Sequence, residues 1–373
     1  MRNKTIAVVG ASYLQLPLVR KAREMGLRVV CFAWADGAVC SELADKFYPV
    51  SIVEKEAILE ICRKERIDGI CTIASDVAAP TVAFVAESLG LVGNRFEAAV
   101  RANDKYQMRS TFGKAGIPSP RFASVASGES VDFRDWHFPL IVKPCDRSGS
   151  LGVQKVNNIT ELLQGITRAQ SYSFKKKAIV EEYIEGREIS VEFISFQGRH
   201  YPLTITDKVT TGPPHFVELE HHQPAALSRL QYEATYDLTK NALSALRITD
   251  GASHTEYKIT DDGRVFMIEL GARMGGDFIG SDLVRLSTGY DFVKGVIQVS
   301  LGNFEPPVLT EKKHSGVYFL CKETERLLPF FEQDYTAPGF VRKELLNNDL
   351  KEVLCSADRS GYMIYQASQR IVL

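Results

Sequence analysis

The chain has few of the features that mark secreted, membrane or nucleic-acid-binding proteins. Seven cysteines are scattered singly through 373 residues. Because no CxxC pair occurs, neither a disulfide framework nor a zinc knuckle is indicated. No stretch approaches the roughly 18 apolar residues that are needed to cross a bilayer. A net charge of -1 gives no electrostatic reason to expect nucleic acid or an anionic membrane as a partner.

The N-terminus also lacks the pattern of a secretory signal. A short basic start precedes an apolar run of only about five residues, which is shorter than a signal-peptide core and reads as a first β-strand. Hydrophobic residues make up 45% and charged residues 24%, as in a folded globular protein. We therefore expect a cytoplasmic protein with reduced, mostly buried thiols and two or three compact units.

Residues 1–102 alternate strands and helices. Apolar runs predict strands over 5–9, 28–32 and 69–73, and helical patterns follow over 14–25, 55–64 and 81–89. This alternation indicates βαβ units and a parallel sheet. A dinucleotide fingerprint would need three glycines, but Ser12 and Gln15 stand at two of its positions, so Gly10 is interpreted as a tight turn. Asp76 follows a strand end and could contact substrate; capping the next helix is the favoured reading.

Residues 103–153 place two lysines where an anion would stabilise them. Asn103 or Asp104 is expected to cap a helix that runs to Ala115, with Lys105 in its first turn, against the helix dipole. The apolar strand 139–144 contains Lys143, a charge that is costly there without a partner. The Ser/Gly loop 146–153 follows and can present backbone N–H groups to phosphate. A solvated lysine and a plain turn are the alternatives.

Two later segments carry carboxylates. An apolar strand at 178–182 ends in acids and is followed by Gly186 and a second strand. The runs 254–258 and 265–273 flank an Asp-Gly turn, a strong hairpin signal that brings Glu256 and Glu269 together. Neighbouring carboxylates repel unless a cation lies between them, and Mg²⁺ prefers such oxygen ligands.

The order of these elements resembles the ATP-grasp superfamily: a lysine helix, an IVKP strand, a Ser/Gly loop, an EEYIEG hinge, two strand glutamates and an arginine. The resemblance implies an α/β and α+β fold. An N-terminal parallel α/β domain (1–102) precedes a two-lobed ATP-grasp domain (103–304) with a lid subdomain at about 118–183. A small C-terminal α+β subdomain (305–373) follows.

The resemblance also implies a site for ATP and Mg²⁺, with Mn²⁺ as an alternative metal. Glu181 to Ile184 would form the adenine hinge, Glu188 would bind ribose, and Glu256 and Glu269 would hold the metal. Lys143 and Arg273 would be catalytic, with Arg273 meeting the transferred phosphoryl group or the substrate carboxylate. The full set of implied ATP-binding residues is Lys105, Lys143, Ser148, Gly149, Ser150, Gly152, Glu181, Glu182, Tyr183, Ile184 and Glu188.

The implied activity is an ATP-dependent ligase that converts a carboxylate into an acyl phosphate and joins it to an amine. The family motif usually reads Glu-x-Asn-x-Arg, whereas Gly271 stands in place of the Asn here. The Gly-Ala-Arg form looks like the branch of L-amino-acid ligases; carbamoyl-phosphate-synthase-like and phosphoribosylglycinamide-synthetase-like enzymes are similar. Expected partners are a small carboxylate and an amine, and family habit allows a homodimer. The alternatives are a purine-synthesis or bicarbonate-activating enzyme, or a non-catalytic ATP-binding regulator.

Simpler interpretations of single residues stay open. Glu181 and Glu182 could be surface acids, and Arg273 could pair with Glu269 as a structural ion pair. His254 is expected to share a face with Glu256 and is more often a structural hydrogen-bonder than a catalyst in such a position. Lys208 and the loop 210–218 could cover the acceptor site or lie on the surface. The histidines at 221–222 lack the spacing of a zinc site.

Overall fold

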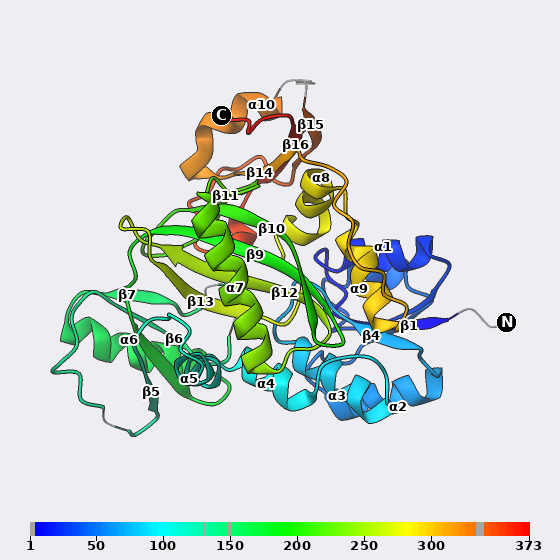
Figure 1. Ribbon diagram of the computed structural model, residues 1–373, viewed down its shortest axis with the longest axis horizontal. Coiled ribbons are helices and arrows are strands. Elements are labelled where there is room, and N and C mark those ends of the chain that lie inside the picture. Colours follow the sequence, from blue (N-terminus) through cyan, green and yellow to red (C-terminus); the bar gives the residue numbers. More distant parts are fainter. Residues whose placement is uncertain (1–3, 130, 148, 150, 333–338) are drawn as a thin grey trace.

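A computed structural model describes residues 4–129, 131–147, 149, 151–332 and 339–373 of the chain. Its strands form three sheets (Figure 1). A parallel sheet contains the N-terminal strands, a small antiparallel sheet follows, and a long antiparallel sheet occupies the middle of the molecule. The predicted mixture of α/β and α+β architecture is confirmed. No helix among the described residues is both long and apolar enough to span a membrane.

The N-terminal sheet has the order β3-β2-β1-β4, with all neighbouring strands parallel. All five side chains of β1 are buried, as expected for a strand covered on both faces. Predicted and observed bounds agree for β1 and β2 and differ by a few residues at the other ends. The elements are β1 (Thr5–Val9), α1 (Leu16–Glu24), β2 (Arg28–Phe32), β3 (Lys46–Tyr48), α2 (Lys55–Glu65), β4 (Gly69–Cys71) and α3 (Ala79–Leu89).

Two helices lead from this sheet into the small one. The side chain of Asp104 caps α5 by accepting a hydrogen bond of 3.0 Å from the Gln107 amide, which confirms one of the two predicted caps and places Lys105 at the first helical position. The small sheet has the order β5-β8-β6-β7 and is covered by α6. The elements are α4 (Phe96–Asn103), α5 (Lys105–Lys114), β5 (Phe122–Ala126), β6 (Leu140–Pro144), β7 (Gln154–Val156), α6 (Ile159–Tyr172) and β8 (Lys177–Glu182).

The central sheet has the order β13-β12-β9-β10-β11-β14-β16-β15, and α7 lies along it in Figure 1. A capping box between Ser228 and Gln231 begins α7. The elements are β9 (Arg187–Phe196), β10 (Arg199–Thr210), β11 (Glu218–Gln223), α7 (Arg229–Leu246), β12 (Gly251–Ile259), β13 (Val265–Gly271), α8 (Val284–Thr288), α9 (Phe292–Ser300), β14 (His314–Leu320), α10 (Leu328–Glu332), β15 (Phe340–Leu345) and β16 (Gly361–Ala367).

One hydrophobic core joins the parallel sheet to the central one. Ile6 and Val8 of β1 belong to the same buried cluster as Ile194 of β9 and Val296 of α9. At the other end, β14, β16 and β15 continue the central sheet beyond β11, so the C-terminal strands share its hydrogen-bond ladder. The division into 1–102, 103–304 and 305–373 stays a prediction.

Candidate active site

A cavity of about 190 Å³ lies between the small sheet and the central sheet. Its walls come from α5, β6 and the loop after it, the end of β8, and strands β10, β12 and β13. The predicted site residues that line it are Lys105, Lys143, Gly149, Glu181, Glu182, Tyr183, Ile184, Glu188, Glu256, Glu269 and Arg273. Gly152 is not among the lining residues, and Ser148 and Ser150 lie outside the described residues.

The hairpin β12–β13 sets two carboxylates side by side. Glu256 and Glu269 are directly opposed in its register, which confirms the prediction that the hairpin brings them together. Lys105 Nζ lies 2.5 Å from Glu269 Oε1 and donates a second bond of 2.8 Å to the Arg147 carbonyl. Burial alone would lower the pKa of Lys105, but Glu269 raises it above its ordinary value. Lys105 is therefore a cation beside the carboxylate pair.

Lys143 of β6 contacts a carboxylate on the neighbouring strand. Its Nζ lies 2.7 Å from Glu181 Oε2, and Arg109 Nε lies 2.7 Å from Glu181 Oε1. Burial would raise the pKa of Glu181, but Arg109 and Lys143 lower it to about 2. Both oxygens of Glu181 thus have cationic partners. Its proposed contact with the adenine amine stays a prediction.

Arg109 is a residue that sequence reasoning missed. It is fully buried on α5 and also donates to backbone carbonyls of β13, including a 3.3 Å bond to Met267. A signal was present: Lys105, Met108, Arg109 and Phe112 are the buried positions of α5, at the spacing of one helix face. Two cations on a buried helix face need anions to meet them, and Glu181 and Glu269 are those anions.

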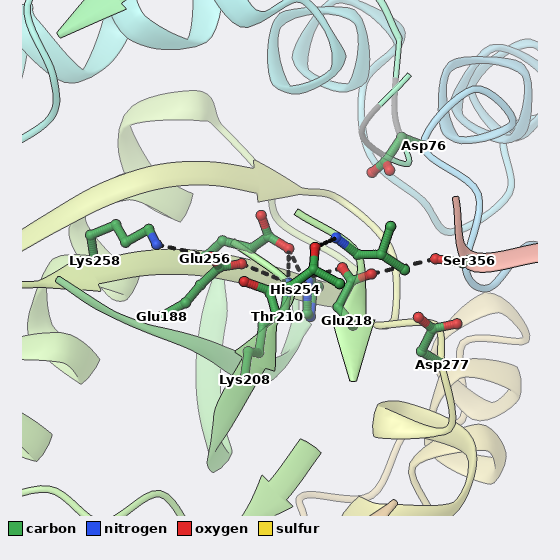
Figure 2. Close-up of polar contacts among 12 residues, drawn as sticks. Asp76, Glu188, Lys208, Thr210, Glu218, His254, Glu256, Lys258, Asp277 and Ser356 are labelled. Atoms are coloured by element: carbon green, nitrogen blue, oxygen red, sulfur yellow. Dashed lines mark hydrogen bonds and ion pairs between the residues drawn. The ribbon is translucent and has the colours of Figure 1, made fainter. Parts of the chain in front are cut away.

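Lys208 of β10 is surrounded by three carboxylates (Figure 2). Its Nζ lies 2.6 Å from Glu256, 3.2 Å from Glu188 and 3.5 Å from Glu218. Burial would lower the pKa of Lys208, but these acids raise it well above its ordinary value. Part of the loop 210–218 faces the cavity, since Phe216 and Glu218 line it. Whether the loop covers an acceptor site stays a prediction.

His254 lies on the same face of β12 as Glu256, as predicted, with Nε2 at 3.3 Å from Glu256 Oε1. Its Nδ1 hydrogen-bonds the carboxylate of Glu192, a fully buried residue of β9 that the sequence did not single out. The Gly275 amide donates to the other Glu192 oxygen at 3.1 Å. Burial would lower the pKa of His254, but Glu192 and Glu256 raise it to about 9. The imidazolium therefore links two carboxylates at neutral pH.

The favoured interpretation of Asp76 is wrong, and the structural alternative offered for Arg273 is wrong as well. The cap of α3 is Ala78, not Asp76, and the Asp76 carboxylate instead accepts a bond of 2.7 Å from Arg273 Nη2. The alternative pairing of Arg273 with Glu269 is replaced by this contact, because Glu269 pairs with Lys105. Both outcomes follow from docking of the parallel sheet against β13, a long-range arrangement that local spacing does not encode.

The residue types at the cavity suit a nucleotide with a divalent cation. Lysines and an arginine face an opposed pair of carboxylates, and Mg²⁺ commonly binds through one or two carboxylates together with phosphate oxygens. Among the described residues, no group of three or more His, Cys, Asp and Glu side chains is arranged to hold a metal. The assignment of Glu256 and Glu269 as metal ligands stays a prediction.

A comparison with known families identifies the part of the chain that supplies most of the cavity lining. Residues 136–282 match the family model of the ATP-grasp domain. The chain contains an ATP-grasp domain. The match includes Lys143, the hinge, both strand glutamates and Arg273, so the resemblance drawn from the sequence is confirmed.

Curated relatives of the ATP-grasp chain are ligases. It is 30% identical over 247 residues to the alanine–anticapsin ligase of Bacillus subtilis, a match that covers 59% of this chain and 51% of the relative. It is 29% identical over 201 residues to a D-alanine–D-alanine ligase of Staphylococcus epidermidis, covering 49% of this chain and 55% of the relative. The chain therefore spans about half the length of the curated relatives it matches.

Solved structures extend the likeness over nearly the whole ATP-grasp chain. An L-amino acid ligase from Bacillus licheniformis superposes with a TM-score of 0.79 at 24% identity, covering 99% of this chain and 94% of the other. A phosphoribosylglycinamide synthetase from Anaerococcus prevotii gives 0.77 at 21% identity, covering 99% and 95%. At these identities the likeness shows the fold, including the parallel N-terminal sheet and the C-terminal strands.

Proposed function

We propose that the chain is an ATP-dependent ligase that activates a carboxylate as an acyl phosphate and joins it to an amine, with an amino acid as the carboxylate substrate. The observation that carries this proposal is the cavity itself, which Lys105, Lys143 and Arg273 line together with the opposed Glu256–Glu269 pair. The curated relatives are named as an alanine–anticapsin ligase and a D-alanine–D-alanine ligase, and these names support the same class of enzyme.

Each group has a role that its contacts suit. Lys143 is held by Glu181 at one wall and Lys105 by Glu269 at the other, so both cations are oriented before a triphosphate arrives. Bound Mg²⁺ would supply charge neutralisation for phosphoryl transfer, with Glu256 and Glu269 as its protein ligands. Arg273 would stabilise charge on the transferred phosphoryl group.

The substrates complete the reaction without a protein nucleophile. The substrate carboxylate attacks the terminal phosphorus and ADP leaves; the amine then attacks the acyl carbon and inorganic phosphate leaves. Residues 181–184 would form the adenine hinge, with Glu188 at the ribose. The residues of the acceptor side would include Phe216 and Glu218, since both line the cavity next to Lys208.

Phosphate release from Mg²⁺·ATP, screened over pools of amino acids and other small carboxylates and amines, tests the proposal. Release that requires two pooled compounds and disappears in Glu269→Gln would establish a ligase and identify its substrates. Glu233→Gln is the matched control, because this exposed glutamate of α7 pairs with Arg229 at 2.7 Å and does not line the cavity. Nucleotide binding without release in any pool would favour the regulatory alternative, and release with bicarbonate as the carboxylate would favour the bicarbonate-activating one.

A further inference from the structure

Asp76 reaches the cavity from the N-terminal parallel sheet, whereas the glutamates that line the cavity belong to the small and central sheets. It follows β4 at the carboxyl edge of the parallel sheet, is 8% exposed and lines the same cavity as Arg273. Figure 2 shows Asp76 on a separate loop, apart from the group around Lys208. The Ala74 amide donates a 3.0 Å bond to the Met274 carbonyl, so this loop is fixed to the segment after β13.

The Asp76 carboxylate occupies the space that a side chain at Gly271 of β13 would fill. Its Oδ2 accepts from Arg273 Nη2 at 2.7 Å. A Cβ added at Gly271 would lie 2.5 Å from Asp76 Oδ1 and 3.2 Å from Arg273 Cζ. Gly271 is a strand residue without a positive φ, so its backbone conformation does not require glycine. The requirement is room for Asp76.

Arg273 has other anions to turn to if Asp76 is removed. Its pKa is raised by Asp76 and, to a smaller degree, by Glu256 and Glu192, against the effect of burial. Its Nε is buried and has no hydrogen-bond partner within the described part of the chain. An arginine released by Asp76 would pair with these glutamates, which would turn it away from the Asp76 end of the cavity and neutralise Glu256.

We propose that Asp76 is a positioning residue: it holds the Arg273 guanidinium at the end of the cavity that receives the terminal phosphate, and Gly271 is glycine in order to admit it. This inference rests on the proposed function, because it requires that a nucleoside triphosphate binds in the cavity. It assigns the N-terminal parallel sheet a part in the site that the ATP-grasp residues alone do not supply.

Calorimetry of two nucleotides tests the proposal without relying on turnover. The ratio of the Kd for ADP to the Kd for a non-hydrolysable ATP analogue, both with Mg²⁺, measures the contribution of the terminal phosphate. Because a hydrogen bond to a charged group is involved, we expect Asp76→Ala and Arg273→Ala each to lower this ratio by about tenfold. If Asp76 acts through Arg273, the double variant loses no more than Arg273→Ala alone.

Two further variants separate positioning from folding. Gly271→Ala should lower the ratio as Asp76→Ala does, since its Cβ would displace the carboxylate. Asp45→Ala is the matched control: Asp45 also belongs to the N-terminal domain and also pairs with an arginine, Arg23, but it does not line the cavity. It should leave the ratio unchanged.

The outcomes separate this inference from the proposed function. An unchanged ratio in Asp76→Ala, or an additive loss in the double variant, would overturn the positioning role even if ligase turnover is found. A wild-type ratio of one would do the same. Failure of the wild type to bind either nucleotide would overturn the proposed function and this inference together.

Discussion

The cavity holds two carboxylate–cation clusters that differ in how closed they are. The Glu181 side chain is 3% exposed and has Arg109 and Lys143 on its two oxygens. Glu256 and Glu269 are each 27% exposed, and each is paired with a lysine through Oε1. The Glu181 cluster (Arg109, Lys143, Glu181) is complete before any ligand binds, whereas the Glu256–Glu269 cluster, with Lys105 and Lys208, has a side that faces the cavity.

The difference separates two tasks. A closed ion-pair cluster fixes the direction of Lys143 and is expensive to disrupt, because loss of one member leaves a buried charge unpaired. In the partly open cluster, the two carboxylates are accessible from the cavity, where a metal ion could approach them. We therefore expect substitutions of Glu181 to act mainly on folding and those of Glu256 and Glu269 mainly on turnover.

The largest expected effect is on stability, from Glu181→Gln. Two buried cations lose their anion, so the free energy of unfolding should fall by about 3–5 kcal/mol, as for a broken buried pair. Urea unfolding followed by circular dichroism measures this change. The exposed pair at Glu233 provides the comparison, and Glu233→Gln should cost less than about 1 kcal/mol. An equal effect of the two variants would contradict the closed character of the Glu181 cluster.

A pH-dependent effect should come from His254. Its pKa is raised from 6.5 to about 9 in the folded protein. The stabilisation is therefore complete below pH 6.5 and is lost as the pH rises toward 9, by an amount of roughly 3 kcal/mol. Urea unfolding of the wild type and of His254→Gln across pH 6 to 9.5 measures this loss. The free energy of unfolding should decline with pH in the wild type and not in the variant.

His200 provides the control for this pH effect. Burial lowers its pKa, so its contribution to stability has the opposite sign: it is lost as the pH falls, not as the pH rises. His200→Gln should therefore keep the wild-type decline between pH 6.5 and 9. A parallel decline in wild type and His254→Gln would show that the imidazolium between Glu192 and Glu256 does not stabilise the fold.

Glu256→Gln should separate turnover from stability. Lys208 retains Glu188 and Glu218 in this variant and His254 retains Glu192, so the free energy of unfolding should fall by less than in Glu181→Gln. Loss of a predicted metal ligand should reduce turnover by at least about a hundredfold, or ~2.7 kcal/mol of transition-state stabilisation. Initial rates over a range of Mg²⁺ concentrations measure this effect. If the variant is destabilised but fully active per folded molecule, Glu256 has a structural role like that of the Glu181 cluster.

The smallest effect is expected from Glu188→Gln. Glu188 contacts Lys208 at 3.2 Å and Lys258 at 3.1 Å, and the fold retains other partners for Lys208. As the predicted ribose ligand it should weaken ATP binding by at most about tenfold, the worth of one charged hydrogen bond. Calorimetry with ATP measures the change. Equal weakening of inorganic triphosphate binding would exclude a ribose contact.

The sequence predicted the parts of this molecule that local spacing encodes. Strand and helix alternation identified the parallel sheet, and the Asp-Gly turn identified the hairpin that opposes Glu256 and Glu269. Long-range pairing could not be predicted from the sequence. Asp76 was assigned to a helix cap because its partner Arg273 lies 197 residues away, and Glu192 was not noticed because it meets His254 only where β9 pairs with β12. Arg109 was missed for a different reason: its position on a buried helix face was readable, but its partner Glu181 lies 72 residues away.

The measurement that tests the central claim most directly is calorimetric titration of Mg²⁺·ATP into the wild type and into Lys143→Met. The account predicts that the wild type binds and that Lys143→Met binds at least about tenfold more weakly, because a charged phosphate contact is lost. Arg134→Met, at an exposed arginine that pairs with Asp132 outside the cavity, should bind as the wild type does. Wild type that does not bind the nucleotide, or Lys143→Met that binds it unchanged, would contradict the assignment of this cavity as a nucleotide site.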